Sequence, residues 1–334
     1  MKKYSIFIGV DISKLTLDIV GINSKNIIVK NSLEINNNRK EIKRYFNSLK
    51  TKYPKDKIMV CFENTGLYGY YLSAILSEFE IDYAMVPALE IHLSKGLVRG
   101  KSDKKDALMI AHYLLANQFK IKVSMLNEFD IDKLKVLNSQ RDRIVKAISV
   151  FRHTYESKDF LPKELTKETY RINDSILKNL KKNLVKIEKE IKKIIDASES
   201  LKTNYNLIKS IPGIGSQTSV YLLIVTKNFT TFKDGRKLAC YAGVAPFPYQ
   251  SGTSINGRTK VHHFADKKLK SLINMCALNA KRWDTEISIY YEKKVAEGKN
   301  KMLVMNNVRN KLLHRVFAVI KRQTPYVNTL KYVA

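Results

Sequence analysis

Four acidic residues stand at positions from which they can hold a metal ion. Asp11 ends the buried apolar run YSIFIGVD, and Glu63 ends the later run KIMVCFE. Asp103 and Asp106 lie three residues apart at the start of a predicted helix, so they share one face of it. A charge at the end of a buried strand is costly unless it serves a ligand. Carboxylate oxygens suit Mg²⁺ or Mn²⁺, and two such ions about 4 Å apart assist displacement at a phosphodiester.

The two acids on the predicted helix have a second interpretation. In SDKKDA, Ser102 or Asp103 can cap the helix, and acids in its first turn are favoured by the helix dipole. Acids that close buried strands are more often functional, so Asp11 and Glu63 carry more weight in the metal hypothesis. Asp18, in the next predicted strand, is expected to face solvent and is left out of the site.

A second candidate for chemistry is the segment PFPYQSGTSINGRTK, which we expect to be a loop. Ser251 stands there before a glycine, and it is followed by Arg258, Lys260, His262 and His263. A hydroxyl that attacks a phosphodiester needs proximity, nearby cations and help in losing its proton. On spacing alone this is a weak indication, because serine, threonine and glycine are typical of any loop.

The glycine turn IPGIG is a candidate nucleic-acid contact. Backbone N–H groups of Gly213 and Gly215, between two short helices, can grip a phosphate, as in helix-hairpin-helix DNA binding. An ordinary tight connection between helices explains the pattern equally well.

The charge of the chain favours a polyanionic partner. Lys and Arg number 60 against 31 acidic residues, a net charge of +29. Such a surplus drives binding to nucleic acid through counterion release and electrostatic steering. An AT-rich coding sequence would also raise the lysine content without any binding, yet we expect a nucleic-acid partner.

Composition also bounds the location of the protein. Three widely spaced cysteines, Cys61, Cys240 and Cys276, suggest neither a disulfide framework nor a zinc site. Asp11 interrupts the first apolar run too early for a signal peptide, and no run approaches the roughly 18 apolar residues of a membrane span. We expect a soluble protein of a reducing cytoplasm, with no membrane partner.

The chain reads as three parts. In residues 1–125 three successive predicted strands precede alternating helices and strands, which favours a mixed α/β sheet of the ribonuclease-H-like kind. Residues 126–204 are helical, and residues 205–334 are mainly helical around the glycine turn and the serine loop. The predicted fold class is therefore α/β followed by α.

The middle part carries two apolar seams. Leu177, Leu180, Leu184, Ile187, Ile191 and Ile194 recur at alternating steps of three and four residues, and a weaker seam precedes them. Pro162 lies between the seams and predicts a helical hairpin. The hairpin can act as a coiled coil that joins two protomers or as a strut within one chain, and the pattern leaves both open.

Taken in order, these segments resemble one family over nearly the whole chain. GVDISK, ENTG, SDKKDALMIAHYL, IPGIGSQTS, FKDGRKLACYAGVAPFPYQSGTSINGRTK and KLLHRVFAVIK are similar to motifs of the DEDD transposases of bacterial insertion sequences. These are bridge-RNA-guided recombinases, and Piv-type DNA invertases are their relatives. Six motifs in one order are far more specific than any one of them.

The resemblance implies a fold, a site and partners. It implies an N-terminal RuvC-like domain with the metal ligands Asp11, Glu63, Asp103 and Asp106, a coiled-coil connector, and a C-terminal domain with a nucleophilic serine. That serine is best matched by Ser251, with Ser254 as the fallback. The implied enzyme cuts and rejoins double-stranded donor and target DNA through a phosphoserine link, as a dimer or tetramer guided by a structured bridge RNA.

One stretch departs from the family pattern. After the serine loop the family commonly has an Ile-Ser-Lys run and then a glycine, whereas this chain has VHHFADKKLK, with Ala265 in place of the glycine. The departure affects the local turn and the cationic contacts around the nucleophile. All four acids and Ser251 are present, so we expect an active enzyme.

Three other functions fit part of the pattern. A metal-dependent RuvC-like nuclease would use the acids alone, with water as the nucleophile. A sugar-kinase or actin-like phosphotransferase would fit GVDISKLTLDIVGIN, but it needs a later glycine-rich adenosine site that we do not find. A non-catalytic nucleic-acid-binding protein would fit the glycine turn, but it would not require acids at two strand ends and on a helix.

Overall fold

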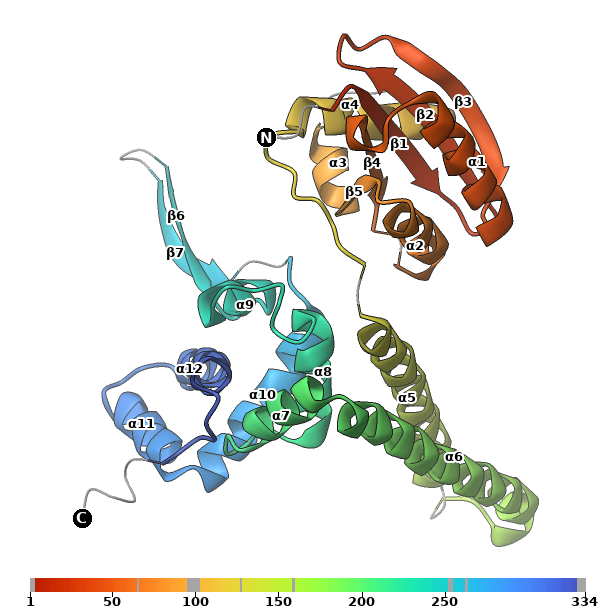
Figure 1. The fold of residues 1–334 in the computed structure, drawn as a ribbon. Helices are drawn as coiled ribbons and strands as arrows, with labels where there is room; N and C mark the ends of the chain where they lie inside the picture. The colour runs from red at the N-terminus through yellow and green to blue at the C-terminus, as the bar shows by residue number, and fades with distance from the viewer. Residues whose placement is uncertain are drawn as a thin grey trace. The chain divides into compact units, whose positions relative to one another are not determined.

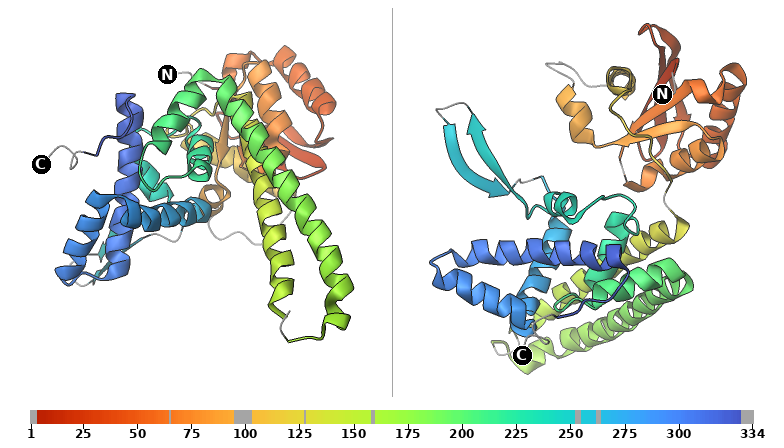
Figure 2. Two further views of the ribbon diagram at one scale, coloured as in Figure 1. Left: turned by 90° about the horizontal axis from the view of Figure 1, so that it is seen from below. Right: turned by 60° about the vertical axis from the view of Figure 1, so that its left-hand side comes forward.

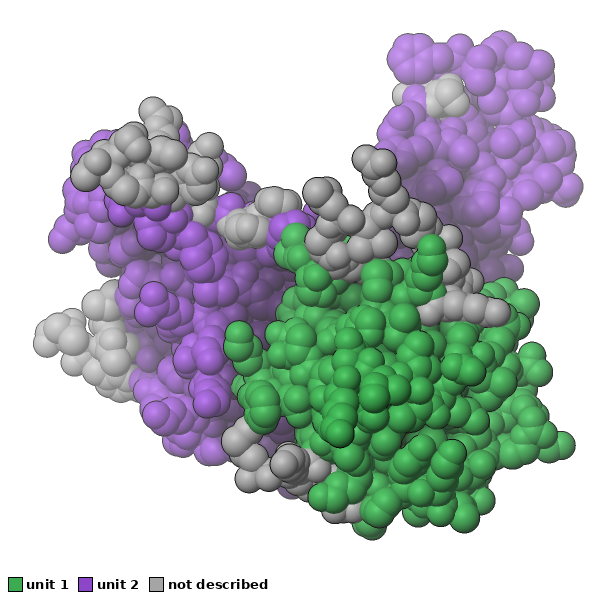
Figure 3. All heavy atoms as spheres, turned by 90° about the horizontal axis from the view of Figure 1, so that it is seen from above, with its two compact units in different colours: residues 1–126 green, residues 127–334 purple. Residues whose placement is uncertain are grey.

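The chain folds into two compact units with separate cores, Met1–Leu126 and Asn127–Ala334 (Figure 3). The computed structural model describes residues 4–64, 66–94, 103–126, 128–157, 160–251, 255–261 and 264–328. The predicted connector and the predicted C-terminal domain both lie in the second unit, so a division near residue 204 stays a prediction.

The first unit is built on a five-stranded mixed sheet, as expected. Its strand order is β3-β2-β1-β4-β5, in which β1, β2 and β3 are antiparallel neighbours and β4 and β5 run parallel to β1. The strands are β1 (Ile6–Ile12), β2 (Thr16–Asn23), β3 (Ile28–Asn36), β4 (Ile58–Glu63) and β5 (Asp82–Val86).

Helices cover both faces of this sheet (Figure 1). Helices α1 (Arg39–Lys52) and α2 (Tyr70–Glu78) bury the face that carries Ile8 and Val10. The opposite face, with Phe7 and Cys61, is buried by α3 (Ala88–Ser94) and α4 (Asp103–Asn117). Because β1 and β4 are covered on both sides, their sequences are continuous apolar runs rather than alternating ones.

Gly9 lets the backbone of α4 approach β1 closely. A Cβ atom at Gly9 would lie 2.1 Å from the carbonyl oxygen of Ala107 and 2.4 Å from the backbone nitrogen of Ala111. Both atoms belong to the helix backbone, which cannot move aside as the end of a flexible side chain does. The glycine therefore sets how near α4 lies to the strand that carries Asp11.

We expect Gly9→Ala to destabilise the first unit by about 1–3 kcal/mol or more, because the added methyl overpacks the contact with α4. Gly21→Ala is the matched control, since the nearest atom to its Cβ would be the Lys30 Cβ, at 3.2 Å. Urea unfolding, together with hydrogen exchange of the β1 amides, measures the difference. Equal stability of the two variants would contradict this account of Gly9.

A helical hairpin opens the second unit, as predicted. Helix α5 (Phe129–His153) runs antiparallel to α6 (Lys163–Ala197) (Figure 2). Ile144 and Ile148 of α5 pack with Leu177 of α6, so the two apolar seams meet within one chain. A role of the hairpin in joining protomers stays a prediction.

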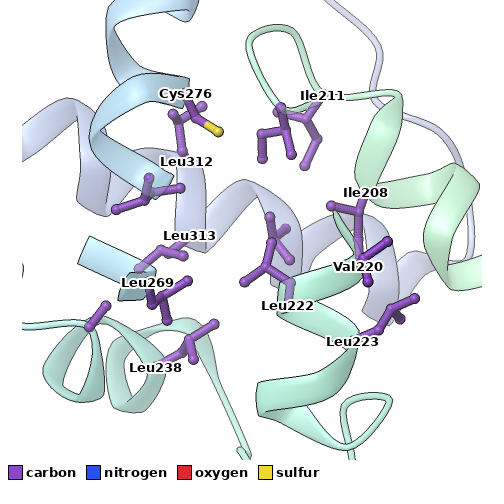
Figure 4. Packing of buried hydrophobic residues seen from close by; sticks show 14 of the residues in the cluster. Ile208, Ile211, Val220, Leu222, Leu223, Leu238, Leu269, Cys276, Leu312 and Leu313 are labelled. Atoms are coloured by element: carbon purple, nitrogen blue, oxygen red, sulfur yellow. The ribbon is translucent and has the colours of Figure 1, made fainter. Parts of the chain in front are cut away.

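Six described helices that follow the hairpin pack into one core, which also includes Ile131 of α5 and Ile195 of α6 (Figure 4). Leu222, Leu269 and Leu312, from three of these helices, are fully buried there. None of the described helices is both long and apolar enough to cross a membrane. The six are α7 (Glu199–Lys209), α8 (Ser216–Thr226), α9 (Gly235–Tyr241), α10 (Lys267–Trp283), α11 (Thr285–Ala296) and α12 (Lys301–Arg322).

The segment PFPYQSGTSINGRTK is not a loop, and that expectation was wrong. It forms a β-hairpin of β6 (Pro246–Ser251) and β7 (Ile255–Val261), which extends away from α9 (Figures 1 and 2). Prolines normally count against a strand because they lack an N–H group. In a two-stranded ribbon every strand is an edge strand, and the register shifts around Pro248, so both prolines are accommodated.

Candidate active site

Two of the predicted metal ligands lie side by side at the carboxyl ends of neighbouring strands. Val10 of β1 pairs with Phe62 of the parallel strand β4, so the next residues, Asp11 and Glu63, occupy adjacent positions. Neighbouring strands are about 4.8 Å apart, and paired residues of parallel strands point to the same face. Asp11 and Glu63 are both half-buried.

The face that carries these two acids is the one covered by α4. Along β1, Gly9 and Asp11 point to the same side, and Gly9 touches the α4 backbone at Ala107. Asp106 precedes Ile110 by four residues, and Ile110 is 1% exposed in the cluster with Phe7. Residues four apart share a helix face, so the half-buried Asp106 lies on the sheet side of α4.

The fourth predicted ligand, Asp103, is the first residue of α4, and its side chain lies outside the described part of the structure. Among the described side chains, no three of His, Cys, Asp or Glu are grouped closely enough to hold a metal ion. Asp11, Glu63 and Asp106 therefore do not make a complete ligand set by themselves. Metal binding by all four acids stays a prediction.

Cys61 lies between the apolar core and the acids. It precedes Glu63 by two residues on β4, on the same face, and it is fully buried. The pKa of its thiol is raised to about 12, first by burial and second by the nearby negative charge of Glu63. The thiol is therefore neutral near pH 7.

Asp18 is a further acid on this face, and the expectation that it faces solvent was wrong. It pairs with Asp11 across β1 and β2, so both side chains point to the same face, and it is only 5% exposed. Helix α4 packs over β2 as well as β1, which buries that strand. The sequence held a signal for this, because Val20 and Ile22, which share a face of the strand with Asp18, are both apolar.

Ser251, the predicted nucleophile, belongs to the second unit. It is the last residue of β6 and pairs with Ile255, at the turn end of the hairpin, whereas Pro246 pairs with Val261 at the other end. Five residue steps of about 3.3 Å place Ser251 roughly 17 Å from Pro246. The side chain of Ser251 and the whole of Ser254 lie outside the described residues.

The predicted cationic residues lie on or after the second strand of the hairpin. Arg258 and Lys260 belong to β7, and Lys260 pairs with Phe247. Their side chains lie outside the described part of the chain, as do His262 and His263 entirely. Their contact with a phosphate stays a prediction.

The glycine turn joins α7 to α8 and packs against α10. Gly213 has φ +90°, and a Cβ atom there would lie 2.7 Å from the carbonyl oxygen of Cys276 and 2.8 Å from the nitrogen of Ala280. Burial raises the pKa of the Cys276 thiol, and its hydrogen bond to Thr218 partly offsets this effect. Packing thus gives Gly213 a role without a phosphate, whereas a Cβ atom at Gly215 would meet no described atom within 4 Å. Phosphate binding at this turn stays a prediction.

Comparisons with known proteins agree along most of the chain. A family model described as a transposase, of the DEDD type found in IS110 elements, matches residues 8–158. A second model, the transposase IS116/IS110/IS902 family, matches residues 205–292. The pilin gene-inverting protein of Moraxella lacunata is 27% identical over 324 residues, which cover 96% of this chain and 97% of that protein.

More distant proteins extend the comparison. The transposase for insertion sequence element IS1533 of Leptospira borgpetersenii is 22% identical and covers 70% of this chain and 73% of its own length. The solved structure of T. thermophilus RuvC in complex with a Holliday junction substrate aligns with 36% of this chain and 100% of that chain. Its identity of 12% and TM-score of 0.28 make this likeness too weak to define the fold.

The paired strand-end acids, the basic charge and these relatives define a DNA transposase or recombinase. More particularly, the chain belongs to the DEDD transposase family of bacterial insertion sequences.

Proposed function

We propose that this transposase cuts and rejoins DNA through a covalent link to Ser251, assisted by a divalent metal at the acids of the first unit. The observation that carries the proposal is the register of β1 and β4, which puts Asp11 and Glu63 at adjacent positions under α4. Acids in the core of a strongly basic chain are costly unless they have a task, and phosphodiester chemistry gives them one.

In the first proposed step the hydroxyl oxygen of Ser251 attacks a DNA phosphorus and passes its proton to a base or to solvent. The bond from phosphorus to one sugar oxygen breaks, and that sugar leaves with a hydroxyl group. In the second step a DNA hydroxyl attacks the phosphoserine, which reforms a phosphodiester and returns the proton to Ser251. Each step exchanges one phosphate ester for another, so rejoining needs no external energy source.

The proposed metal ligands are Asp11, Glu63, Asp103 and Asp106. Their oxygens suit Mg²⁺ or Mn²⁺, which when bound would stabilise the negative charge on the reacting phosphate. Such a cluster also repels an unaccompanied phosphate, so the acids favour DNA binding only together with the cation. Arg258 and Lys260 are proposed to relieve the remaining charge near the serine.

The proposed partners are double-stranded donor and target DNA, a structured bridge RNA and further copies of this chain. The net charge of +29 supports binding to nucleic acid. In the family the acids and the serine of one reaction centre come from different protomers, which supports a dimer or tetramer. Relatives named for pilin gene inversion support inversion as one outcome of the same chemistry.

Recombination of a plasmid that carries the element's junctions is expected to require an RNA transcribed from the DNA that flanks the gene. Base pairing to the RNA, not the protein, would then choose the site, so an RNA with scrambled loops should reduce product to background. Amplification across the new junction measures this. Full recombination without RNA would instead indicate an unguided invertase.

The second candidate function is a metal-dependent nuclease with water as nucleophile. It is favoured by the fact that Asp11, Glu63 and Asp106 all lie in the first unit, whereas Ser251 lies in the second. A nuclease of this kind would need no serine and would leave no covalent intermediate, which makes the two functions separable by experiment.

A further inference from the structure

A hollow of about 370 Å³ lies where the hairpin leads into α10, and the proposed reaction does not use it. Tyr241, Phe264, Ala265 and Asp266 line it. Tyr241 is 45% exposed and Phe264 is 56% exposed, so two aromatic side chains face solvent beside one depression. Ala265, which departs from the family pattern, forms part of its lining.

Tyr241 is held firmly in place. Its ring meets the ring of Phe232 edge-on, with centroids 5.4 Å apart. The backbone N–H of Asp266 donates to the carbonyl of Tyr241 at 2.9 Å. Burial, followed by the Asp266 charge, raises the pKa of the phenol, so it remains a donor at neutral pH.

Asp266 is itself fixed by other donors. The hydroxyl of Tyr221 donates to one carboxylate oxygen at 2.8 Å, and the N–H of Leu269 donates to the other at 2.8 Å. A ring that is already ordered loses little conformational entropy when a flat ligand stacks on it. The exposed part of Tyr241 is therefore a preformed stacking surface.

The two exposed aromatic rings of the hollow, in a chain of strongly basic net charge, favour a nucleobase as the ligand. Every base has a π-face, and proteins that hold unpaired strands stack bases on exposed aromatic rings within a basic surface. The chain has a net charge of +29, and Phe264 follows the end of β7 by three residues. The same hairpin carries Ser251 at its turn end, roughly 17 Å from Pro246 at its root, and this length corresponds to about five nucleotide steps.

We propose that this hollow binds an unpaired base of the DNA strand that Ser251 attacks, stacked on Tyr241 and Phe264, within about five nucleotides of the cut. The choice of DNA rests on the proposed function of Ser251, because the root of the hairpin must follow the strand that its tip engages. Holding a base outside the duplex would fix the position of the cut and keep the strand from re-pairing before rejoining.

The test measures binding of a fluorescent single-stranded DNA to the full-length Ser251→Ala protein, so that no chemistry intervenes. Phe264→Ala is expected to weaken binding by about 5- to 150-fold, the range for loss of one stacked base, while Phe264→Tyr retains affinity. Phe160→Ala is the matched control, because Phe160 is 84% exposed but lies far along the chain, between α5 and α6. An oligonucleotide with abasic positions should bind the parent protein more weakly than intact DNA does, by a similar factor. The Phe264→Ala variant should bind abasic and intact DNA with equal affinity.

The possible outcomes separate this proposal from that for Ser251. If Phe264→Ala binds intact DNA as tightly as its parent, or if abasic DNA binds equally well, the base pocket is overturned even when the enzyme recombines DNA. If the dependence on Phe264 appears only with RNA of the same sequence, the DNA assignment is overturned. If the binding results hold but no covalent adduct forms with intact Ser251, the pocket stands and the phosphoserine mechanism fails.

Discussion

Replacing Ser251 with alanine is expected to abolish the covalent protein–DNA adduct and to slow strand transfer by about 10⁴- to 10⁶-fold. The magnitude follows that for enzymes that lose a nucleophilic serine and keep the rest of their site. Alanine has no oxygen to bond to phosphorus, so the proposed phosphoserine link cannot form. Denaturing gels of end-labelled junction DNA measure the adduct and the strand transfer together.

Ser254→Ala is the matched control for this experiment. Ser254 stands three residues after Ser251 in the same segment and is the alternative nucleophile, so the two substitutions make the same chemical change at neighbouring positions. We expect it to retain adduct formation. If Ser254→Ala loses the adduct and Ser251→Ala keeps it, the nucleophile has been assigned to the wrong serine; if Ser251→Ala cleaves at the full rate, water is the nucleophile.

The strands of the first unit were predictable from the sequence because their hydrophobic pattern follows directly from their burial. Strands β1 and β4 are buried on both faces, so they read as the uninterrupted apolar runs around Val10 and Phe62. A charged residue at the end of such a run is conspicuous, which is how Asp11 and Glu63 were found. That they are neighbours depends on strand order and register, which the sequence does not state and the sheet supplies.

Two errors arose where local sequence rules compete with tertiary structure. Asp18 was placed in solvent because an acid within a strand is usually on an exposed face, but α4 covers β2 as well and buries it. The serine segment was assigned to a loop because it is rich in Gly, Pro, Ser and Thr, although a two-stranded ribbon has room even for Pro246 and Pro248 on its open edges. A short stretch of sequence reveals neither that α4 covers β2 nor that, among the described strands, β6 and β7 pair only with each other.

The turn at Gly213 shows that a motif typical of a ligand site can also be explained by packing. The motif IPGIG matched a phosphate-binding pattern, but one of its glycines, Gly213, also satisfies a packing requirement that no local pattern reveals. The contact of Gly213 with the α10 backbone needs a residue that lacks Cβ and adopts φ +90°. A glycine motif therefore has to be weighed against its neighbours in space before it is taken as a ligand site.

Asp11→Asn is expected to weaken binding of Mn²⁺ by more than about 100-fold, because loss of a direct ligand exceeds the 10- to 100-fold cost of losing an outer-shell partner. Strand cleavage should fall by at least about 10³-fold, since the phosphate loses a preorganised positive charge. Isothermal titration calorimetry of the full-length protein measures metal affinity independently of activity. Circular dichroism establishes that the variant has folded.

Glu34→Gln is the matched control for Asp11→Asn. Glu34 lies on β3 and pairs with Asp18 of β2, which in turn pairs with Asp11 of β1. Unlike Asp11, Glu34 is exposed. Removing its charge lowers the negative potential near the sheet without removing a proposed ligand, so a purely electrostatic effect would appear in both variants. A large loss for Asp11→Asn alone assigns the metal to the strand ends; unchanged Mn²⁺ affinity in Asp11→Asn would place the metal elsewhere and leave the acids without their proposed task.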